Sequence, residues 1–255
     1  MQAHPTLEGT AALVTGASSG IGHATARSLA AQGASVALAA RRVERLEDLA
    51  AGIRADGGAA VVIPADVTDE KQAREAVSRT VEVLGRLDTL VNNAGVMLLG
   101  PIVDAPVEEW RRMVDLNLLG LLYCTHAAVP HLIDAAAGER GVADVVNISS
   151  VAGRVSRNGS GVYNATKHGV GAFSESLRQE VTRRHVRVSL VEPGAVSTEL
   201  AGHNRPEILE QMGKRFAGVE RMVAEDIADA ISYIVTRPRR VAINEVLIRP
   251  TEQEG

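Results

Sequence analysis

The sequence predicts an α/β fold in which a doubly wound parallel sheet carries helices on both faces. Short β-branched and apolar runs alternate with longer segments of helical period along nearly the whole chain, which is the pattern of βα units in a parallel sheet. The 255 residues include no low-complexity tract and no linker long enough to separate two cores. A single domain spanning residues 1–255 is therefore favoured over two smaller ones.

The expected elements alternate in order along the chain. Short apolar runs predict strands at Ala11–Thr15, Ser35–Ala40, Ala60–Pro64, Thr89–Asn92, Asp144–Ile148, Arg187–Val191 and Glu245–Ile248. Segments of helical period between them predict helices at Ile21–Gln32, Glu44–Ala55, Glu70–Leu84, Val107–Leu132, Gly161–Arg184 and Glu225–Val235. The stretch 194–223 is longer than an ordinary connection and contains Pro206. We expect it to form a mobile lid over a ligand, with an irregular surface excursion as the alternative.

The composition excludes several classes of protein. The 27 basic and 31 acidic residues give a net charge of −4, which argues against a protein that binds nucleic acid through bulk charge. The single Cys124 cannot form an internal disulfide and is expected in the core, and the seven histidines show no metal-ligand spacing. The N-terminus has no targeting signal, and no run approaches the ~18 apolar residues of a membrane span. A cytoplasmic protein is therefore expected.

A glycine-rich loop follows the first strand and leads directly into the first helix. It comprises Gly16, Ala17, Ser18, Ser19, Gly20, Ile21 and Gly22. Glycines allow a tight turn and a close backbone approach, and a helix N-terminus offers free N–H groups to a pyrophosphate. The position of the motif, in the first βα unit, predicts a dinucleotide site.

The end of the second strand predicts which dinucleotide binds. NAD-binding sheets usually have an acidic residue there for the ribose 2′-hydroxyl, whereas this strand ends in Ala40, Arg41 and Arg42. Two guanidinium groups in place of a carboxylate favour the 2′-phosphate of NADP(H). The alternative is that both arginines only solvate the start of a helix.

Two further strand ends fit the same ligand. Asp66 and Val67 follow the third strand, where the carboxylate is expected either to accept from the adenine amino group or to cap the next helix. The fourth strand leads into Asn93, Ala94 and Gly95. There an amide side chain can tie neighbouring strands and a glycine allows close approach to a ribose, with a plain turn as the alternative.

Tyr163 and Lys167 are four residues apart, on one face of a predicted helix. Aromatic residues are scarce, with two Phe, one Trp and three Tyr, so this tyrosine is a candidate for a chemical role. A neighbouring cation favours the phenolate and would lower the phenol pKa from ~10 toward the range useful for acid–base catalysis.

The glycine loop, the Asn93 segment, a serine before Tyr163, the Tyr-x-x-x-Lys pair and Pro193-Gly194 occur in one order. Together they resemble the short-chain dehydrogenase/reductase family over roughly residues 7–250. The resemblance implies a Rossmann-type domain with seven strands in the order 3-2-1-4-5-6-7, and a homo-oligomer, either tetramer or dimer. Stretches such as 96–101 and 248–251 are similar to the branch with clavulanate dehydrogenase and NADP-dependent 3-hydroxy acid dehydrogenases.

The resemblance also implies roles for individual residues. Tyr163 is expected to exchange the proton with the substrate oxygen, and Lys167 to lower its pKa and bind the nicotinamide ribose. Ser149, fourteen residues before the tyrosine, is expected to polarise the carbonyl, with Ser150 as a close competitor. Asn117 matches the family's asparagine in a water relay to the lysine. Further matches, on the nicotinamide side, are Pro193, Gly194, Val196 and Thr198.

The expected activity is NADP(H)-dependent interconversion of an aldehyde or ketone with an alcohol. The substrate side is expected to include Met97, Ser149, Arg154, Asn158 and Gly194, and Arg154 is a candidate partner for a substrate carboxylate unless it is a solvated loop residue. Two alternatives remain: a regulatory protein that senses NADP(H) without turnover, and a lyase or epimerase on the same scaffold.

Overall fold

The computed structural model describes residues 7–254 and confirms the predicted sheet. Residues 1–6, on which the prediction of no targeting signal partly depends, lie outside this range. Seven parallel strands occur in the order β3-β2-β1-β4-β5-β6-β7. They are β1 (Ala11–Thr15), β2 (Ser35–Ala40), β3 (Ala59–Pro64), β4 (Thr89–Asn92), β5 (Ala143–Ile148), β6 (Val186–Pro193) and β7 (Glu245–Ile248).

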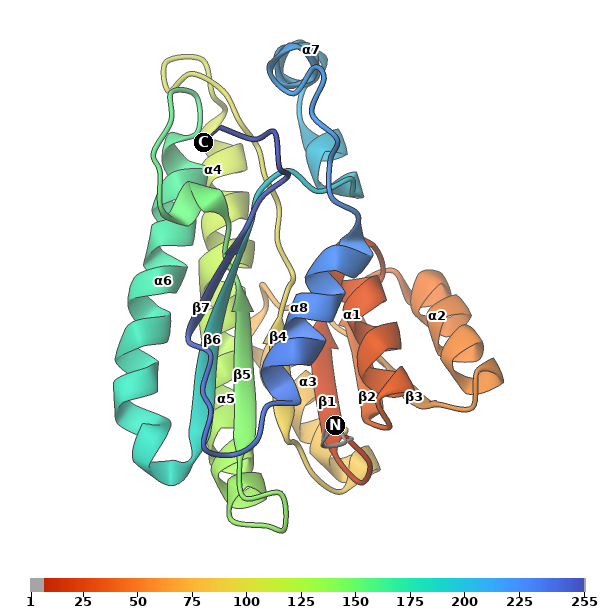
Figure 1. Ribbon diagram of the computed structural model, residues 1–255. Helices are drawn as coiled ribbons and strands as arrows, with labels where there is room; N and C mark the ends of the chain where they lie inside the picture. The colour runs from red at the N-terminus through yellow and green to blue at the C-terminus, as the bar shows by residue number, and fades with distance from the viewer. Residues whose placement is uncertain (1–6, 255) are drawn as a thin grey trace.

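Helices cover both faces of this sheet, as Figure 1 shows. One face carries α1 (Gly20–Ala31), α2 (Val43–Ala55) and α8 (Ala224–Val235). The other carries α3 (Glu70–Leu84), α5 (Gly120–Ala136) and α6 (Gly161–Val181). Shorter elements are α4 (Val107–Val114), α7 (Pro206–Arg215), the 3-10 turns η2 (Val151–Gly153), η3 (Thr182–Arg184) and η4 (Glu199–His203), and the π-helical turn η1 (Asp115–Leu119).

The core consists of two layers because every central strand is buried on both faces. In β1, Val14 packs with the α1, α2 and α8 side, whereas Leu13 packs with the α3, α5 and α6 side. Cys124 belongs to the second layer and is fully buried, as predicted. This period-two division of apolar side chains fixes the register of each strand, so the carboxyl ends of all seven strands meet at one edge.

The long helix predicted at Val107–Leu132 is instead divided. A π-helical turn, η1, separates α4 from α5, and α5 continues to Ala136. By length and composition the whole stretch Val107–Ala136 could cross a membrane. However, Cys124 and Leu132 on α5 are fully buried in the second core layer, which is how the core helix of a sheet domain behaves.

The segment expected as a lid contains a helix that the sequence analysis did not predict. α7 occupies Pro206–Arg215, after the 3-10 turn η4. Figure 1 shows that α7 lies apart from the sheet, beyond the carboxyl ends of the strands. The name "lid" is kept below for residues 194–223.

Candidate active site

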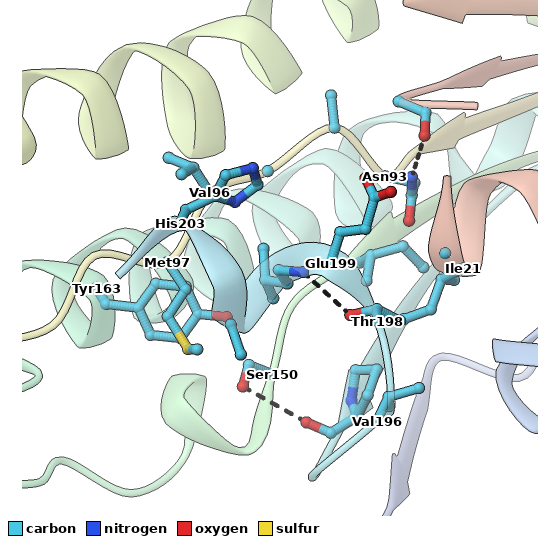
Figure 2. A pocket seen from close by; sticks show the side chains of 18 of the residues that line it. Ile21, Asn93, Val96, Met97, Ser150, Tyr163, Val196, Thr198, Glu199 and His203 are labelled. Atoms are coloured by element: carbon cyan, nitrogen blue, oxygen red, sulfur yellow. Dashed lines mark hydrogen bonds between the residues drawn. The ribbon is translucent and has the colours of Figure 1, made fainter. Parts of the chain in front are cut away.

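A cavity of about 420 Å³ lies at the carboxyl ends of the strands, where open α/β sheets bind ligands. Its walls come from the loops after β1, β2, β3, β4, β5 and β6, from α6 and from the lid. In Figure 2, Tyr163 lies beside Met97 and Ser150, while Thr198 lies across from Ile21 of the glycine loop.

The glycine loop is packed too tightly for side chains. Gly16 has φ +65°, and a Cβ on it would lie 2.8 Å from the Ala94 Cα. A Cβ on Gly22 would lie 2.4 Å from the Asn93 Nδ2 and 2.5 Å from the Gly16 oxygen. Gly16 and Gly20 line the cavity and Gly22 lies behind them, so this third glycine serves the close packing of α1 against β4.

The N-terminus of α1 faces the cavity without a side-chain cap. Its N-cap residue Ser19 makes no capping hydrogen bond, and the first turn contains no acidic residue. Free N–H groups at a helix N-terminus attract anions. The loop therefore fits a dinucleotide pyrophosphate.

Asn93 ties the glycine loop to the end of β4. Its Nδ2 donates to the oxygens of Thr15 at 3.0 Å and Gly16 at 3.2 Å. The Thr15 hydroxyl in turn accepts from the backbone N–H groups of Asn93 and Ala94. Ala94 and Gly95 also line the cavity. The amide thus holds two strand ends together, as one of the two sequence interpretations proposed.

Arg41 and Arg42 both line the cavity, but they are held differently. Arg42 donates from Nε and Nη2 to the Ser18 hydroxyl at 3.1 and 3.0 Å, and from Nη2 to the Ser19 hydroxyl at 2.7 Å. Arg41 is mostly exposed, with its Nη1 3.7 Å from the Asp66 carboxylate. The Arg42 guanidinium is therefore held by the glycine loop itself.

Asp66 lines the cavity together with Val67 and does not cap α3. Its Oδ1 accepts from the backbone N–H and the hydroxyl of Thr68 at 3.1 and 2.8 Å. The cap of α3 is Asp69, whose carboxylate accepts from the Gln72 N–H. Of the two interpretations of Asp66, the helix cap is wrong.

Tyr163 is buried in the cavity wall beside Ser150 (Figure 2). Burial raises the pKa of the Tyr163 phenol to about 12, and the interaction with the Ser150 side chain acts in the opposite direction. Ser150 also accepts from the Ala152 N–H at 3.1 Å, which orients its hydroxyl. The Ser150 hydroxyl donates to the Pro193 oxygen at 3.4 Å (Figure 2). The Ser150 side chain therefore lies beside the Tyr163 phenol and is held by the end of β6.

The placement of Ser149 contradicts the role expected for it. Its hydroxyl donates to the backbone oxygen of Lys167 at 3.1 Å, and the residue is buried. Adjacent residues at a strand end point in different directions, so only one of the two serines meets the phenol. The serine paired with Tyr163 is Ser150, thirteen residues before it.

Lys167 is buried behind Tyr163. Its Nζ donates to the Ile148 oxygen at 2.8 Å and lies 5.9 Å from the centre of the Tyr163 ring. Burial lowers the pKa of the Lys167 ammonium to about 8. The expected lowering of the phenol pKa by this cation is therefore not seen, because desolvation of the phenolate is the largest effect on the Tyr163 pKa.

Asn117 lies in the π-helical turn and does not itself line the cavity. Its Oδ1 accepts from the Val96 N–H at 2.8 Å, and its Nδ2 donates to the Val96 oxygen at 2.8 Å. A Cβ on Gly95 would lie 3.3 Å from the Asn117 Oδ1 and 3.9 Å from the Lys167 Nζ. The asparagine is thus close to the lysine, and it fixes the loop after β4.

The four residues predicted for the nicotinamide side line the cavity, together with one residue that the sequence analysis missed. Pro193, Gly194, Val196 and Thr198 all line the cavity. Gln253, near the end of the chain, accepts from the Ala195 N–H at 2.8 Å, and a Cβ on Gly194 would lie 2.4 Å from its Oε1. The C-terminal segment therefore supports this loop, a contact that no local motif reveals.

On the substrate side, Met97 lines the cavity but Arg154 and Asn158 do not. The Arg154 guanidinium is held by the carboxylates of Glu192, which is buried, and Glu245. The hydrogen bond to Glu192 is the largest cause that raises the pKa of Arg154. Arg154 thus ties the turn after β5 to β6 and β7, and a substrate carboxylate would have to displace two internal ones.

Other cationic side chains line the cavity in place of Arg154. They are Arg157 in the loop before α6 and Arg215 and Arg221 in the lid. Arg215 and Arg221 lie 5.7 and 5.6 Å from the ring centre of Phe216. Within residues 7–254, neither lid arginine forms an ion pair with a carboxylate. The lid also contributes Glu199, Leu200, Ala201, His203 and Met212 to the cavity wall.

Comparison with known proteins identifies the family. The model of the short chain dehydrogenase family matches residues 10–209, so the chain belongs to this family of oxidoreductases. It is 41% identical over 248 residues to glycine betaine reductase ATRR of Emericella nidulans, covering 97% of this chain but only 19% of that much longer protein.

Two further relatives match along their full length. An uncharacterized oxidoreductase of Staphylococcus epidermidis is 36% identical over 94% of this chain and 96% of its own. The closed form of a serine dehydrogenase complexed with NADP+ has a TM-score of 0.87 at 32% identity, covering 96% of this chain and 97% of that one. The arrangement of strands and helices is therefore that of known family members.

Proposed function

We propose that the protein is an NADP(H)-dependent oxidoreductase that interconverts an aldehyde or ketone with an alcohol. The observation that carries this proposal is the neighbouring pair of Tyr163 and Ser150 in the same cavity as the glycine loop and Arg42. Two neighbouring hydroxyl groups can both donate to a carbonyl oxygen. The resemblance to a serine dehydrogenase solved with NADP+ supports the cofactor.

The residues divide the chemistry among them. Ser150 holds the substrate oxygen, and Tyr163 donates a proton to that oxygen during reduction or accepts one during oxidation. Lys167 lies behind the phenol, and Asn117 holds the loop after β4 in place. When bound, NADP(H) supplies or takes up the hydride; the protein contributes orientation and the proton.

The cofactor preference is testable at the end of β2. Replacing Ala40→Asp together with Arg41→Ala puts a carboxylate where the 2′-phosphate would lie and removes one cation. We expect the NADP/NAD ratio of kcat/KM to fall by about tenfold or more, because a charge-assisted contact becomes a repulsion. Steady-state kinetics with both cofactors measure this ratio. Arg74→Ala, which removes an exposed cation on α3, serves as the control, and an unchanged ratio in the double variant would overturn the assignment.

The reductase, the cofactor sensor and the lyase or epimerase differ in whether they consume NADPH. Mixing the protein with NADPH and a panel of aldehydes, β-keto acids and cyclic ketones, and following NADPH absorbance, separates them. Net oxidation of NADPH supports the proposed reductase. No oxidation with any substrate favours a protein that only senses the cofactor, and product without net NADPH loss favours a lyase or epimerase. The intact Tyr163, Ser150 and Lys167 site favours turnover.

We propose a small carboxylate-bearing carbonyl compound as substrate, with lid arginines as its partners. Arg215 and Arg221 line the cavity and have no carboxylate partner among the residues that the structure describes, whereas Arg154 is paired with Glu192 and Glu245. We expect Arg215→Ala or Arg221→Ala to raise KM for acidic substrates by about tenfold and to change KM for neutral aldehydes little. Arg154→Ala is the matched control. Equal effects on both substrate types would contradict this assignment.

We also propose that the protein is a cytoplasmic homo-oligomer, a tetramer or a dimer. Supporting a homo-oligomer, α4 exposes the apolar side chains of Val107 and Val114, which an interface between two copies of the chain would bury. Light scattering of the purified protein gives the mass that tests this part of the proposal.

A further inference from the structure

The lid is tied to the 2′-phosphate site through one carboxylate. Glu199, the first residue of η4, accepts from the Arg42 Nη1 at 2.7 Å through Oε2 and from the Arg45 Nη1 at 2.5 Å through Oε1. These hydrogen bonds, first that of Arg45 and then that of Arg42, lower the pKa of Glu199 to about 2. Glu199 is therefore an anion that is already paired with Arg42, the arginine expected to bind the cofactor phosphate.

The other donors of Arg42 are also engaged. Its Nε and Nη2 donate to the hydroxyls of Ser18 and Ser19. A hydroxyl can rotate and donate to a phosphate, so the serines can contribute to binding the phosphate that takes their place at Arg42. An ionised carboxylate has no proton to donate, and it repels a phosphate. Glu199 is thus the group that must give way when a 2′-phosphate binds.

Arg45 provides a place for Glu199 to remain. Arg42 is the N-cap residue of α2 and Arg45 lies within its first turn, and each holds a different carboxylate oxygen. Thr198, next to Glu199, lies over the glycine loop, since a Cβ on Gly20 would be 3.1 Å from its Cγ2. Releasing Arg42 therefore does not require the lid to leave the loop.

We infer that Glu199 competes with the 2′-phosphate for Arg42. When the phosphate binds, Glu199 releases Arg42 and stays bound to Arg45. This inference rests on the proposed NADP(H) site. Glu199 therefore weakens the binding of a cofactor with a 2′-phosphate, whereas it does not affect a ligand with a 2′-hydroxyl. NADH has no phosphate to place on Arg42, so its binding leaves the ion pair intact.

The test is equilibrium binding without substrate. Dissociation constants for NADPH, NADH, 2′-AMP and 5′-AMP are measured by titration calorimetry on the wild type, on Glu199→Gln and on Glu207→Gln, which removes an exposed lid carboxylate away from Arg42. We expect Glu199→Gln to bind NADPH and 2′-AMP about fivefold more tightly, with NADH and 5′-AMP unchanged. Glu207→Gln is expected to match the wild type. The gain should shrink at high salt, because the competing pair is exposed.

A second pair of variants tests the part assigned to Arg45. Arg45→Gln leaves Glu199 on Arg42 alone and is expected to weaken NADPH binding, whereas the same change in the Glu199→Gln background should have little effect. If Arg45→Gln lowers NADPH affinity equally in the wild type and in Glu199→Gln, Arg45 binds the phosphate directly and does not act by holding Glu199. If Glu199→Gln binds NADPH more weakly than the wild type, the proposed competition is wrong but the proposed NADP(H) site is not affected. A wild type that does not distinguish 2′-AMP from 5′-AMP overturns the cofactor site as well.

Discussion

Tyr163→Phe is expected to lower kcat for carbonyl reduction by about 10²–10⁴-fold, the contribution of a positioned general acid, while leaving the dissociation constant of NADPH nearly unchanged. The substitution removes one hydroxyl and keeps the ring, which packs with Val96, Leu98 and Met113. The proton donor is lost and the wall of the cavity remains. Stopped-flow reduction and equilibrium NADPH binding measure the two effects separately, and near-normal turnover in this variant would contradict the mechanism.

The neighbouring serines provide a matched pair of controls. The Ser150 side chain interacts with the Tyr163 phenol, whereas the Ser149 hydroxyl donates to the Lys167 backbone oxygen. We expect Ser150→Ala to lower kcat by about 10²–10³-fold, as for the loss of one preorganised donor. Ser149→Ala should change it by less than about tenfold, since only a structural hydrogen bond is lost. If Ser149→Ala lowered kcat more than Ser150→Ala did, Ser149 would be the residue that polarises the carbonyl, as its spacing from Tyr163 first indicated.

The pH dependence of the two directions follows from the same phenol. Burial raises the pKa of Tyr163 to about 12, so the phenol keeps its proton at neutral pH. Reduction needs the protonated form, which is present below this pKa and is lost as the pH rises through it. Oxidation needs the phenolate and should increase with pH. Opposite slopes of kcat/KM in the two directions at alkaline pH are the expected result.

The sheet could be predicted from the sequence because its strands are short, apolar and buried on both faces. The predicted bounds of Ala11–Thr15, Ser35–Ala40 and Glu245–Ile248 agree with the structure. The helix at Pro206–Arg215 is not predicted from the sequence, because the whole stretch 194–223, with its proline, is interpreted as a lid or an irregular excursion. Proline also favours the first turn of a helix, and Glu207 near the start with Lys214 near the end completes a start-and-stop signal.

The errors in the site come from geometry that spacing does not encode. Choosing between Ser149 and Ser150 requires knowing how the chain turns after β5, and a difference of one residue reverses the direction of a side chain. The partners of Arg154 are 38 and 91 residues away in the chain. The type of each side chain was visible in the sequence, but the identity of its partner depends on the sheet order.

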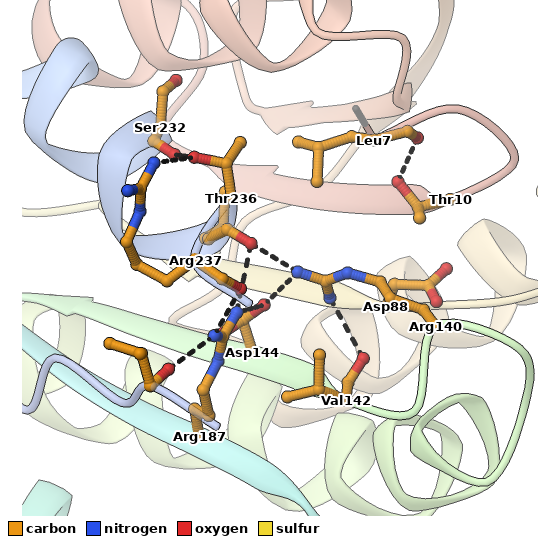
Figure 3. Close-up of polar contacts among 12 residues, drawn as sticks. Leu7, Thr10, Asp88, Arg140, Val142, Asp144, Arg187, Ser232, Thr236 and Arg237 are labelled. Atoms are coloured by element: carbon orange, nitrogen blue, oxygen red, sulfur yellow. Dashed lines mark hydrogen bonds and ion pairs between the residues drawn. The ribbon is translucent and has the colours of Figure 1, made fainter. Parts of the chain in front are cut away.

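Arg187→Met is expected to lower the free energy of unfolding by about 3–5 kcal/mol, as when one partner of a buried ion pair is removed. Arg187 is 6% exposed, at the end of the sheet opposite the cavity. It donates to both carboxylate oxygens of Asp144 at 2.7 and 3.0 Å and to the backbone oxygens of Val235, Arg237 and Val241 (Figure 3). Its guanidinium therefore joins β5, β6 and the end of α8.

The large cost arises because methionine fills the volume but satisfies none of these oxygens. Within residues 7–254, Asp144 keeps Arg140 alone as a charged partner, at 2.8 Å, and three carbonyl groups lose a donor. Arg27→Met is the matched control, since it breaks an exposed 2.6 Å pair with Asp56 and should cost less than about 1 kcal/mol. Urea unfolding of both variants measures the difference, and equal costs would show that the cluster adds nothing beyond a surface pair. Because this cluster lies at the other end of the strands, NADPH affinity of the folded Arg187→Met protein should stay at the wild-type value, which separates the support of the sheet from the chemistry at its opposite edge.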